Sequence, residues 1–201
     1  MNNSFWEAVA KRRTIYALGN EQLVNEKRLE EILKDTLLHT PSAFNSQSTR
    51  VVLLLGTEHT KLWNIVLAKL KERVSDKQFE QTEKKINTCF AAGYGTVLFF
   101  EDCSVVEGLQ KSFPSYSEMF PIWSQHANAM HQFVVWTGLE NEGLGVSLQH
   151  YNPLIDEAVA KEWKIPQNWQ LVAQMPFGSP LVDAEPKEFK ALEERLLVFN
   201  N

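Results

Sequence analysis

The segment RVVLLLG, residues 50–56, is the stretch on which the fold assignment depends. Its unbroken run of apolar residues predicts a buried β-strand, and Gly56 ends it. TVLFF at residues 96–100 predicts a second buried strand. WQLVAQM at residues 169–175 alternates like a third strand before FGSP, and GLGVSL at residues 143–148 predicts a short strand entered through glycines.

Helical patterns lie between these strands, although not as a regular βαβ series. Asn25 is a candidate N-cap for a helix that ends before Pro41, and Ser75 with Gln78 forms a capping-box pattern. Pro121 predicts the start of a long helix, and Asn152–Pro153 predicts a cap for another. The interleaving predicts an α+β fold with a central sheet flanked by helices. The expected inner face of the long helix consists of Ile122, Ala129, Met130, Phe133 and Thr137.

RLLVF, residues 195–199, has strand character after a charged connection that contains proline. A late, detached strand can pair with the sheet of a second subunit. This gives the hypothesis of an obligate dimer that exchanges its C-terminal strand.

The bulk composition limits the classes of partner. The chain has 201 residues and 44% hydrophobic composition, which suits one sizeable domain or a subunit of an intimate dimer, and we expect one domain spanning residues 1–201. Its net charge is −5. The acidic balance argues against nucleic acid or an anionic membrane as the main partner. The N-terminal sequence lacks a signal-peptide core and no apolar run is long enough to span a membrane, so we expect a cytoplasmic protein.

Two short polar segments are candidates for binding chemistry. KRRT, residues 11–14, sets Arg12 and Arg13 beside a hydroxyl, and guanidinium groups bind phosphate through paired charged hydrogen bonds. A solvated helix end is the alternative. PSAFNSQSTR, residues 41–50, could be a turn or a row of groups facing a polar ligand. With the glycine-entered strand near residue 145, both segments could line one flat, phosphate-bearing ligand.

The segments KRRT, PSAFNSQS and NEGLGVSLQHYNP occur in the order and at the spacing of the FMN-dependent nitroreductases. RRTIYAL, SAFNSQSTR and FPIWSQHANAMHQFVVWTGLE resemble most closely the fatty-acid-repression subgroup of that family. The resemblance runs from about residue 5 to the tail. It implies a nitroreductase-like fold with a mostly antiparallel sheet, and a homodimer with FMN at the subunit interface. It also implies NADH or NADPH as electron donor and nitroaromatic, quinone or related small-molecule acceptors, reduced in a ping-pong cycle.

The resemblance also implies positions for the FMN site. Arg12 and Thr14, with Arg13 beside them, match residues that hold the phosphate and ribityl chain. Gln149 and His150 match the backbone near the reactive N5 of the ring, and Lys187, with Lys190 less closely, matches basic residues that complete the phosphate site. The segment that reaches the flavin from the other subunit corresponds to Pro41, Ser42, Ala43, Asn45 and Gln47.

One position departs from the family pattern. Many members carry a basic residue two places after the hydroxyl position, where this chain has Tyr16. A cation near flavin N1 and O2 stabilises the anionic reduced ring, so Tyr16 leaves that role unfilled unless another residue supplies it. The redox potential and the substrate range are therefore open.

The remaining polar residues offer weaker signals. His126 and Trp123 could border a substrate pocket, with a surface histidine and a packing tryptophan as the alternatives. His126 and His131 diverge by roughly 140° on a helix, which disfavours a metal site, and no catalytic side chain is assigned. A flavin-binding regulatory or stress-response protein with incidental reductase activity is the competing function.

Overall fold

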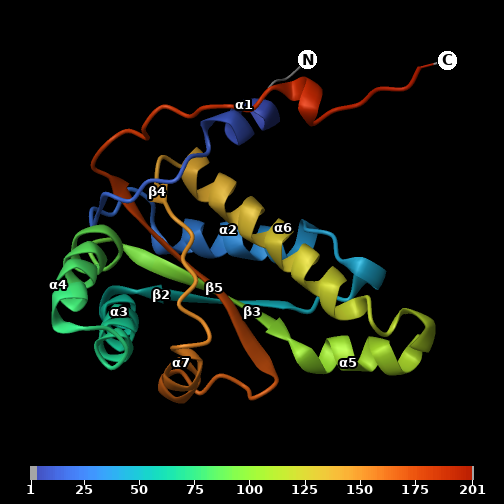
Figure 1. The fold of residues 1–201 in the computed structure, drawn as a ribbon, viewed down its shortest axis with the longest axis horizontal. Helices are drawn as coiled ribbons and strands as arrows, with labels where there is room; N and C mark the ends of the chain where they lie inside the picture. Colours follow the sequence, from blue (N-terminus) through green and yellow to red (C-terminus); the bar gives the residue numbers. More distant parts are fainter. Residues whose placement is uncertain (1–3, 201) are drawn as a thin grey trace.

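A five-stranded antiparallel sheet forms the centre of the structure, a computed structural model that describes residues 4–200 (Figure 1). Residues 1–3 and 201, the ends of the predicted domain, lie outside the described residues. The strand order is β1-β5-β3-β2, with β4 also paired to β5. The strands are β1 (Leu18–Gly19), β2 (Thr49–Leu55), β3 (Gly95–Asp102), β4 (Gly145–Val146) and β5 (Trp169–Pro180). The predicted α+β class is confirmed, with an antiparallel sheet.

Strands β3 and β5 are the two central strands. Every residue of β3 is buried, whereas β2 at the sheet edge is mostly half-buried, so the burial predicted for residues 50–56 is only partial. Strand β5 runs through FGSP to Pro180 and is buried from Ala173 to Ser179, which corrects the predicted alternation and end point. Gly178 explains the close packing there, because a Cβ at this position would lie 2.2 Å from the Gly19 carbonyl oxygen.

Helices cover both faces of the sheet. The helices are α1 (Ser4–Lys11), α2 (Glu26–His39), α3 (Gly56–Lys71), α4 (Asp76–Lys85), α5 (Cys103–Ser112), α6 (Phe120–Asn141) and α7 (Asp156–Glu162). Shorter turns are η1 (Ala43–Asn45), the π-helical η2 (Ile86–Phe90), η3 (Pro114–Tyr116) and η4 (Leu192–Glu194). No helix within residues 4–200 is long and apolar enough to cross a membrane.

Two apolar clusters make the core, one on each face. Side chains of α2 and α6, including Leu33 and Val135, pack with Phe99 on one face. Side chains of α3 and η2, including Trp63 and Phe90, pack with Phe100 on the other. The alternation along β3 thus assigns neighbouring phenylalanines to opposite layers.

Three of the predicted helix starts are confirmed and one is wrong. Pro121 lies in the first turn of the long helix α6, as predicted. Asn25 caps α2 by accepting the Arg28 backbone N–H at 2.8 Å, and Ser75 with Gln78 forms the capping box of α4. The Asn152–Pro153 pair does not cap a helix, because α7 begins at Asp156 after an intervening turn.

The prediction for the inner face of α6 is wrong. Ile122, Met130 and Phe133 are 47%, 41% and 38% exposed. The side that faces the sheet instead carries polar groups that hydrogen-bond to each other and to the backbone, among them Asn128 and Gln132. An apolar side of α6 therefore remains open in the single chain.

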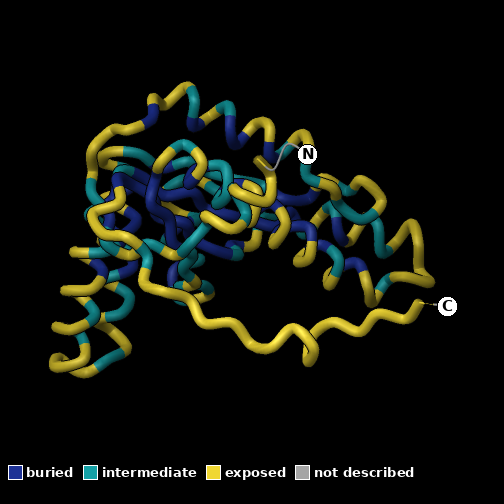
Figure 2. The backbone as a smooth tube through the Cα atoms, turned by 90° about the horizontal axis from the view of Figure 1, so that it is seen from above, coloured by how far each residue is buried: buried dark blue, intermediate teal, exposed yellow. Residues whose placement is uncertain are grey.

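The C-terminal segment lies apart from the core. Residues after Pro180 run along the outside of the molecule and are exposed almost throughout (Figure 2). RLLVF forms no strand in the described chain, and Phe199 is 90% exposed. Exchange of this segment with a partner stays a prediction.

Candidate functional site

The two arginines lie where α1 gives way to an extended segment beside β4. Thr14 forms an isolated parallel β-bridge with Val146, and the Ile15 backbone N–H donates to the Val146 carbonyl at 2.9 Å. The Arg12 guanidinium carbon lies 4.6 Å from the centre of the Trp136 ring on α6, a cation–π distance. The start of the chain is thus fixed against both the sheet and the C-terminal half of α6.

Glu140 organises this region, and the sequence reasoning missed it. Its Oε2 accepts the Arg13 backbone N–H at 2.8 Å and its Oε1 accepts the Trp136 Nε1–H at 2.6 Å. Burial raises the pKa of the Glu140 carboxyl. The available signal was an acidic residue one helical turn after Trp136, which places both on one side of α6. We call Arg12, Arg13, Trp136 and Glu140 the arginine end of α6.

The donor set at the arginine end suits a phosphate. Within residues 4–200 the Arg12 guanidinium has no hydrogen-bond or ion-pair partner, and Thr14 is exposed. The five N–H donors of Arg12 and the Thr14 hydroxyl are therefore available to an anion. The residues present fit the phosphate of a bound nucleotide.

The tail begins at the same place. The Arg13 side chain donates to the Glu185 carbonyl, so Lys187 follows two residues beyond a contact with the arginine end. Lys187 is exposed, with its Nζ 5.2 Å from the Phe189 ring. Lys190 is exposed and makes no hydrogen bond or ion pair within the described chain. The structure therefore brings the start of the tail to Arg13. Lys190 makes no contact of this kind with Arg12 or Arg13 within the described chain.

Gln149 and His150 lie on the segment that continues from β4. The backbone of Gln149 pairs with Gln174 of β5 through bonds of 2.7 and 2.9 Å, which fixes the segment against the sheet. His150 is exposed and borders a hollow of about 410 Å³ between this segment and α6. The polar residues lining the hollow include Gln125, Gln132, Asn152 and Gln170.

The segment from Pro41 to Gln47 has an unusual backbone. Phe44, Asn45 and Gln47 have φ values of 55°, 50° and 49°, in the left-handed region that non-glycine residues rarely adopt. The Ser42 hydroxyl holds the loop by accepting the Gln47 backbone N–H at 3.0 Å. Pro41 and Asn45 are exposed, and Ala43 is half-buried. Backbone strain of this kind concentrates at functional sites.

Aromatic rings surround the same loop. Phe44 lies 4.9 Å from Phe113, 5.3 Å from Phe120 and, nearly parallel at 18°, 6.4 Å from Trp123. Tyr116 lies 5.9 Å from Trp123, also at the N-terminal end of α6. His126 is exposed one turn further along. We call Phe44, Phe113, Tyr116, Phe120 and Trp123 the aromatic end of α6.

The arginine end and the aromatic end are separated along α6. Trp123 and Trp136 are thirteen residues apart on this helix, a separation of about 20 Å at 1.5 Å per residue. In a single chain, Arg12 and Asn45 therefore lie on different parts of the surface.

The region between the ends holds a second buried carboxyl. Glu101 is 2% exposed, and burial raises its pKa. Asn128 donates to Glu101 Oε2 at 3.1 Å and to the Phe100 carbonyl at 3.0 Å, whereas Glu101 Oε1 has no partner. His131 is also buried, with Nδ1 2.7 Å from the Ala127 carbonyl. No cluster of three potential metal-ligating residues occurs among the residues described.

Comparisons with known proteins identify the family of this chain. The model of the nitroreductase family matches residues 9–179. Nitroreductase FRM2 of Saccharomyces cerevisiae is 34% identical over 188 residues, covering 92% of this chain and 93% of the yeast protein. Nitroreductase CinD of Lactococcus lactis, solved with nicotinic acid, superimposes with a TM-score of 0.89 at 43% identity over 98% of this chain and 100% of CinD.

A more distant structure shares the fold. A nitroreductase from Desulfitobacterium hafniense with bound FMN has a TM-score of 0.74 at 14% identity, covering 100% of both chains. CinD has also been solved with chloramphenicol and with 4-nitrophenol.

Proposed function

Because the chain belongs to the nitroreductase family of oxidoreductases, we propose that it is an FMN-dependent enzyme that uses NADH or NADPH to reduce nitroaromatic, quinone or related small acceptors. The observation that carries the proposal is the available donor set of Arg12 and Thr14. Arg12 lies over the Trp136 ring, and Thr14 pairs with Val146 at the start of the segment that bears Gln149. A phosphate monoester carries up to two negative charges and needs several such donors.

Each element has a task in this proposal. Arg12, Arg13 and Thr14 hold the phosphate, and Lys187 joins them when the tail is placed by its partner. The fixed backbone at Gln149 and His150 supports the ring. When bound, FMN supplies the redox chemistry, taking a hydride from the nicotinamide and passing electrons to the acceptor in a ping-pong cycle. No side chain of this chain is needed as an acid or base for the hydride step.

A homodimer completes the site. The exposed apolar side of α6, with Met130 and Phe133, is the expected contact between subunits. A two-fold axis across that side places the aromatic end of one helix beside the arginine end of the other. The strained loop with Asn45 of the partner subunit then reaches the cofactor, and Trp123 with His126 borders the acceptor pocket.

The known complexes support the choice of substrates. CinD binds nicotinic acid, a pyridine carboxylate that resembles the nicotinamide ring, and it binds the nitroaromatic compounds 4-nitrophenol and chloramphenicol. At 43% identity over nearly the whole chain, similar ligands are reasonable candidates here.

Spectroscopy and steady-state kinetics test the proposal. The purified protein, saturated with FMN, should show the visible absorbance of bound oxidised flavin and should oxidise NADH or NADPH faster when 4-nitrophenol or a quinone is added. Tight FMN binding with negligible turnover for every acceptor would favour a regulatory flavoprotein. A protein that stays colourless after FMN is added would exclude the proposal.

A further inference from the structure

The hollow of about 410 Å³ between α6 and the segment after β4 has the features of a small-molecule site. Its volume lies within the range of about 300–1,000 Å³ that is typical of such sites. Ala129, Leu171 and Val172 form an apolar part of its wall, and carboxamide side chains and His150 form the rest. None of the residues that line it is an Asp, Glu, Lys or Arg, so the hollow suits an uncharged ligand with an apolar face.

The amide of Gln132 is oriented by buried hydrogen bonds that begin at the backbone. Asn128 is fully buried, and its Nδ2 donates at 3.0 Å to the Phe100 carbonyl, an oxygen that can only accept. The Asn128 Oδ1 therefore faces Gln132 and accepts from its Nε2 at 2.8 Å. Gln132 is 8% exposed, and its Oε1 has no hydrogen-bond partner within residues 4–200. Gln132 thus leaves one acceptor for the hollow that it lines.

The amide of Asn152 is oriented in the opposite sense. Gln174 is fully buried in β5, and its Oε1 accepts the Tyr151 backbone N–H at 2.7 Å. Because a backbone N–H can only donate, the Gln174 Nε2 faces Asn152 and donates to its Oδ1 at 3.4 Å. The Asn152 Nδ2 makes no hydrogen bond in the part of the chain that the structure describes. Asn152 thus leaves a donor at the hollow to which Gln132 brings an acceptor.

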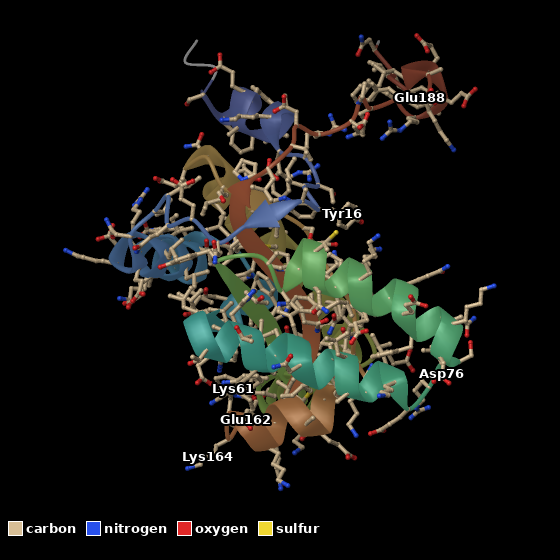
Figure 3. The ribbon with its side chains drawn as sticks, turned by 90° about the vertical axis from the view of Figure 1, so that its left-hand side faces the viewer. Tyr16, Lys61, Asp76, Glu162, Lys164 and Glu188 are labelled. Atoms are coloured by element: carbon tan, nitrogen blue, oxygen red, sulfur yellow. The ribbon has the colours of Figure 1, made fainter. Side chains whose placement is uncertain are left out.

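The segment that carries Asn152 is fixed at both ends. Its start pairs with β5 through the backbone of Gln149, at 2.7 and 2.9 Å. Its end enters α7, where the Glu162 carboxylate lies 3.4 Å from the Lys61 ammonium of α3 (Figure 3). Both polar groups that line the hollow are therefore placed before a ligand binds, and such preorganisation lowers the cost of binding.

We propose that this hollow binds an uncharged planar molecule that carries a primary carboxamide. A primary carboxamide has an N–H donor and a carbonyl acceptor on one carbon, which complements the Gln132 Oε1 and the Asn152 Nδ2. The attached ring lies on the apolar part of the wall. A carboxylate has acceptors only and would set an oxygen against the Gln132 Oε1, with no Lys or Arg among the lining residues to offset it.

The nicotinamide group of the proposed electron donor has this chemistry. Naming it as the natural ligand rests on the proposed function and deepens it, because the hollow would then select the carboxamide of NADH or NADPH. Binding of free nicotinamide needs no turnover, so the site is tested separately from the reaction.

The test compares two uncharged probes, nicotinamide and 3-acetylpyridine, by ligand-observed NMR titration of the FMN-saturated protein. In 3-acetylpyridine a methyl group replaces the amino group of the carboxamide, whereas the carbonyl stays. The wild-type protein should bind nicotinamide about fivefold more tightly, which is the effect of one hydrogen bond. Equal affinities for the two probes, or no binding of nicotinamide, would overturn the assignment.

Substitutions at the two amides should affect the probes differently. Gln132→Met removes the acceptor, so it should weaken nicotinamide binding about fivefold and leave 3-acetylpyridine within about twofold of wild type. Asn152→Asp keeps the acceptor of the Gln174 N–H but replaces the free donor by an oxygen, so both probes should bind about fivefold more weakly. Asn64→Asp makes the same change at an exposed position of α3 outside the hollow, and it should bind both probes normally.

The variants also separate this site from the proposed function. Asn152 is only half-buried, so Asn152→Asp tests the site even if Gln132→Met does not fold. If Asn152→Asp binds nicotinamide as tightly as the wild type, the site is excluded while the proposed function stands. If the wild-type protein prefers nicotinamide but reduces no acceptor with NADH or NADPH, the site stands and the proposed function falls.

Discussion

The two ends of α6 use opposite chemistry on one continuous helix. At the arginine end, Trp136 and Glu140 hold two cationic residues through a ring face and a buried carboxylate. At the aromatic end, rings pack on rings around a loop, and Phe44 remains 51% exposed. The arginine end is hydrogen-bonded within its own chain, whereas the aromatic end keeps large apolar surfaces open.

The difference indicates how the proposed binding site is divided between the two ends of α6. A charged group must be positioned to bind an anion well, and at the arginine end the Trp136 ring and the Glu140 carboxyl do this within one chain. Apolar rings need only a surface to cover, which a partner or a flat ligand can supply. The exposed side of α6 between the two ends is where the two halves would meet.

The largest effect is expected from disrupting the proposed subunit interface on the exposed side of α6. Phe133→Asp places a charge in the proposed interface, and we expect it to weaken dimerisation by about 3 kcal/mol or more and to reduce FMN retention with it. Sedimentation velocity over a range of protein concentrations gives the measurement. Phe133→Leu, which stays apolar, should remain dimeric. A dimeric Phe133→Asp variant with full FMN content would place the interface elsewhere.

Removing the phosphate donor should affect the arginine end alone. Arg12→Ala should weaken FMN binding by about 1.5–3 kcal/mol, the range for charged hydrogen bonds, as measured by fluorescence titration. The exposed Arg73, far from this site in the sequence, is a matched control, and Arg73→Ala should bind FMN normally. Unchanged affinity in Arg12→Ala would remove this residue from the site.

The two buried carboxyls should respond to pH with the same sign and to substitution by glutamine with opposite signs. Burial raises the pKa of both Glu101 and Glu140, so above about pH 4.3, the unfolded value, the folded chain binds more protons than the unfolded chain. The free energy of unfolding therefore falls as pH rises from that value through the folded-state pKa.

Substitution by glutamine separates the two residues. Glu101→Gln removes a charge whose Oε1 has no partner, so at pH 8 the free energy of unfolding should rise by about 1 kcal/mol and its fall with pH should become smaller. Glu140→Gln leaves one acceptor oxygen for two donors, the Arg13 backbone N–H and the Trp136 Nε1–H, so one of them loses its partner and the free energy of unfolding should fall by about 1 kcal/mol. Urea unfolding at pH 5 and pH 8 measures both, and changes of the same sign would contradict the assignment.

The smallest effect is expected at the aromatic end. Trp123→Leu keeps an apolar side chain but loses the stacked ring, which should weaken the binding of 4-nitrophenol by about 0.5–1.5 kcal/mol. KM for 4-nitrophenol should rise by the corresponding factor. FMN affinity should not change, and Trp123→Phe should recover most of the loss. A fall in FMN affinity equal to the rise in KM would mean that Trp123 contacts the cofactor instead.

Local signals in the sequence predicted the local structure well. Asn25, the Ser75–Gln78 pair and TVLFF are each determined by neighbouring residues, and each was found as expected. The inner face of α6 was predicted wrongly, because Met130 and Phe133 are large apolar residues of the kind that usually pack in a core. Hydrophobicity in one chain does not distinguish a side chain that packs inside the subunit from one that awaits another subunit.

The site shows the same division. The type and order of Arg12 and Thr14 made them candidates for the proposed site, whereas Glu140 contacts Arg13 and Trp136 through its position one turn after Trp136 and has no motif of its own. The left-handed backbone at Phe44 and Asn45 could not be predicted, because neither residue is a glycine.

In the proposed dimer, that backbone makes the retention of FMN depend on both subunits. A left-handed conformation at a residue such as Phe44 costs on the order of 1–3 kcal/mol, so an isolated subunit would spend part of its time with the segment in other shapes. Association with a second copy of the chain would stabilise the left-handed conformation of this segment and thereby restore the affinity for FMN. Dilution alone, without any mutation or change of solvent, should then cause the protein to release its bound FMN.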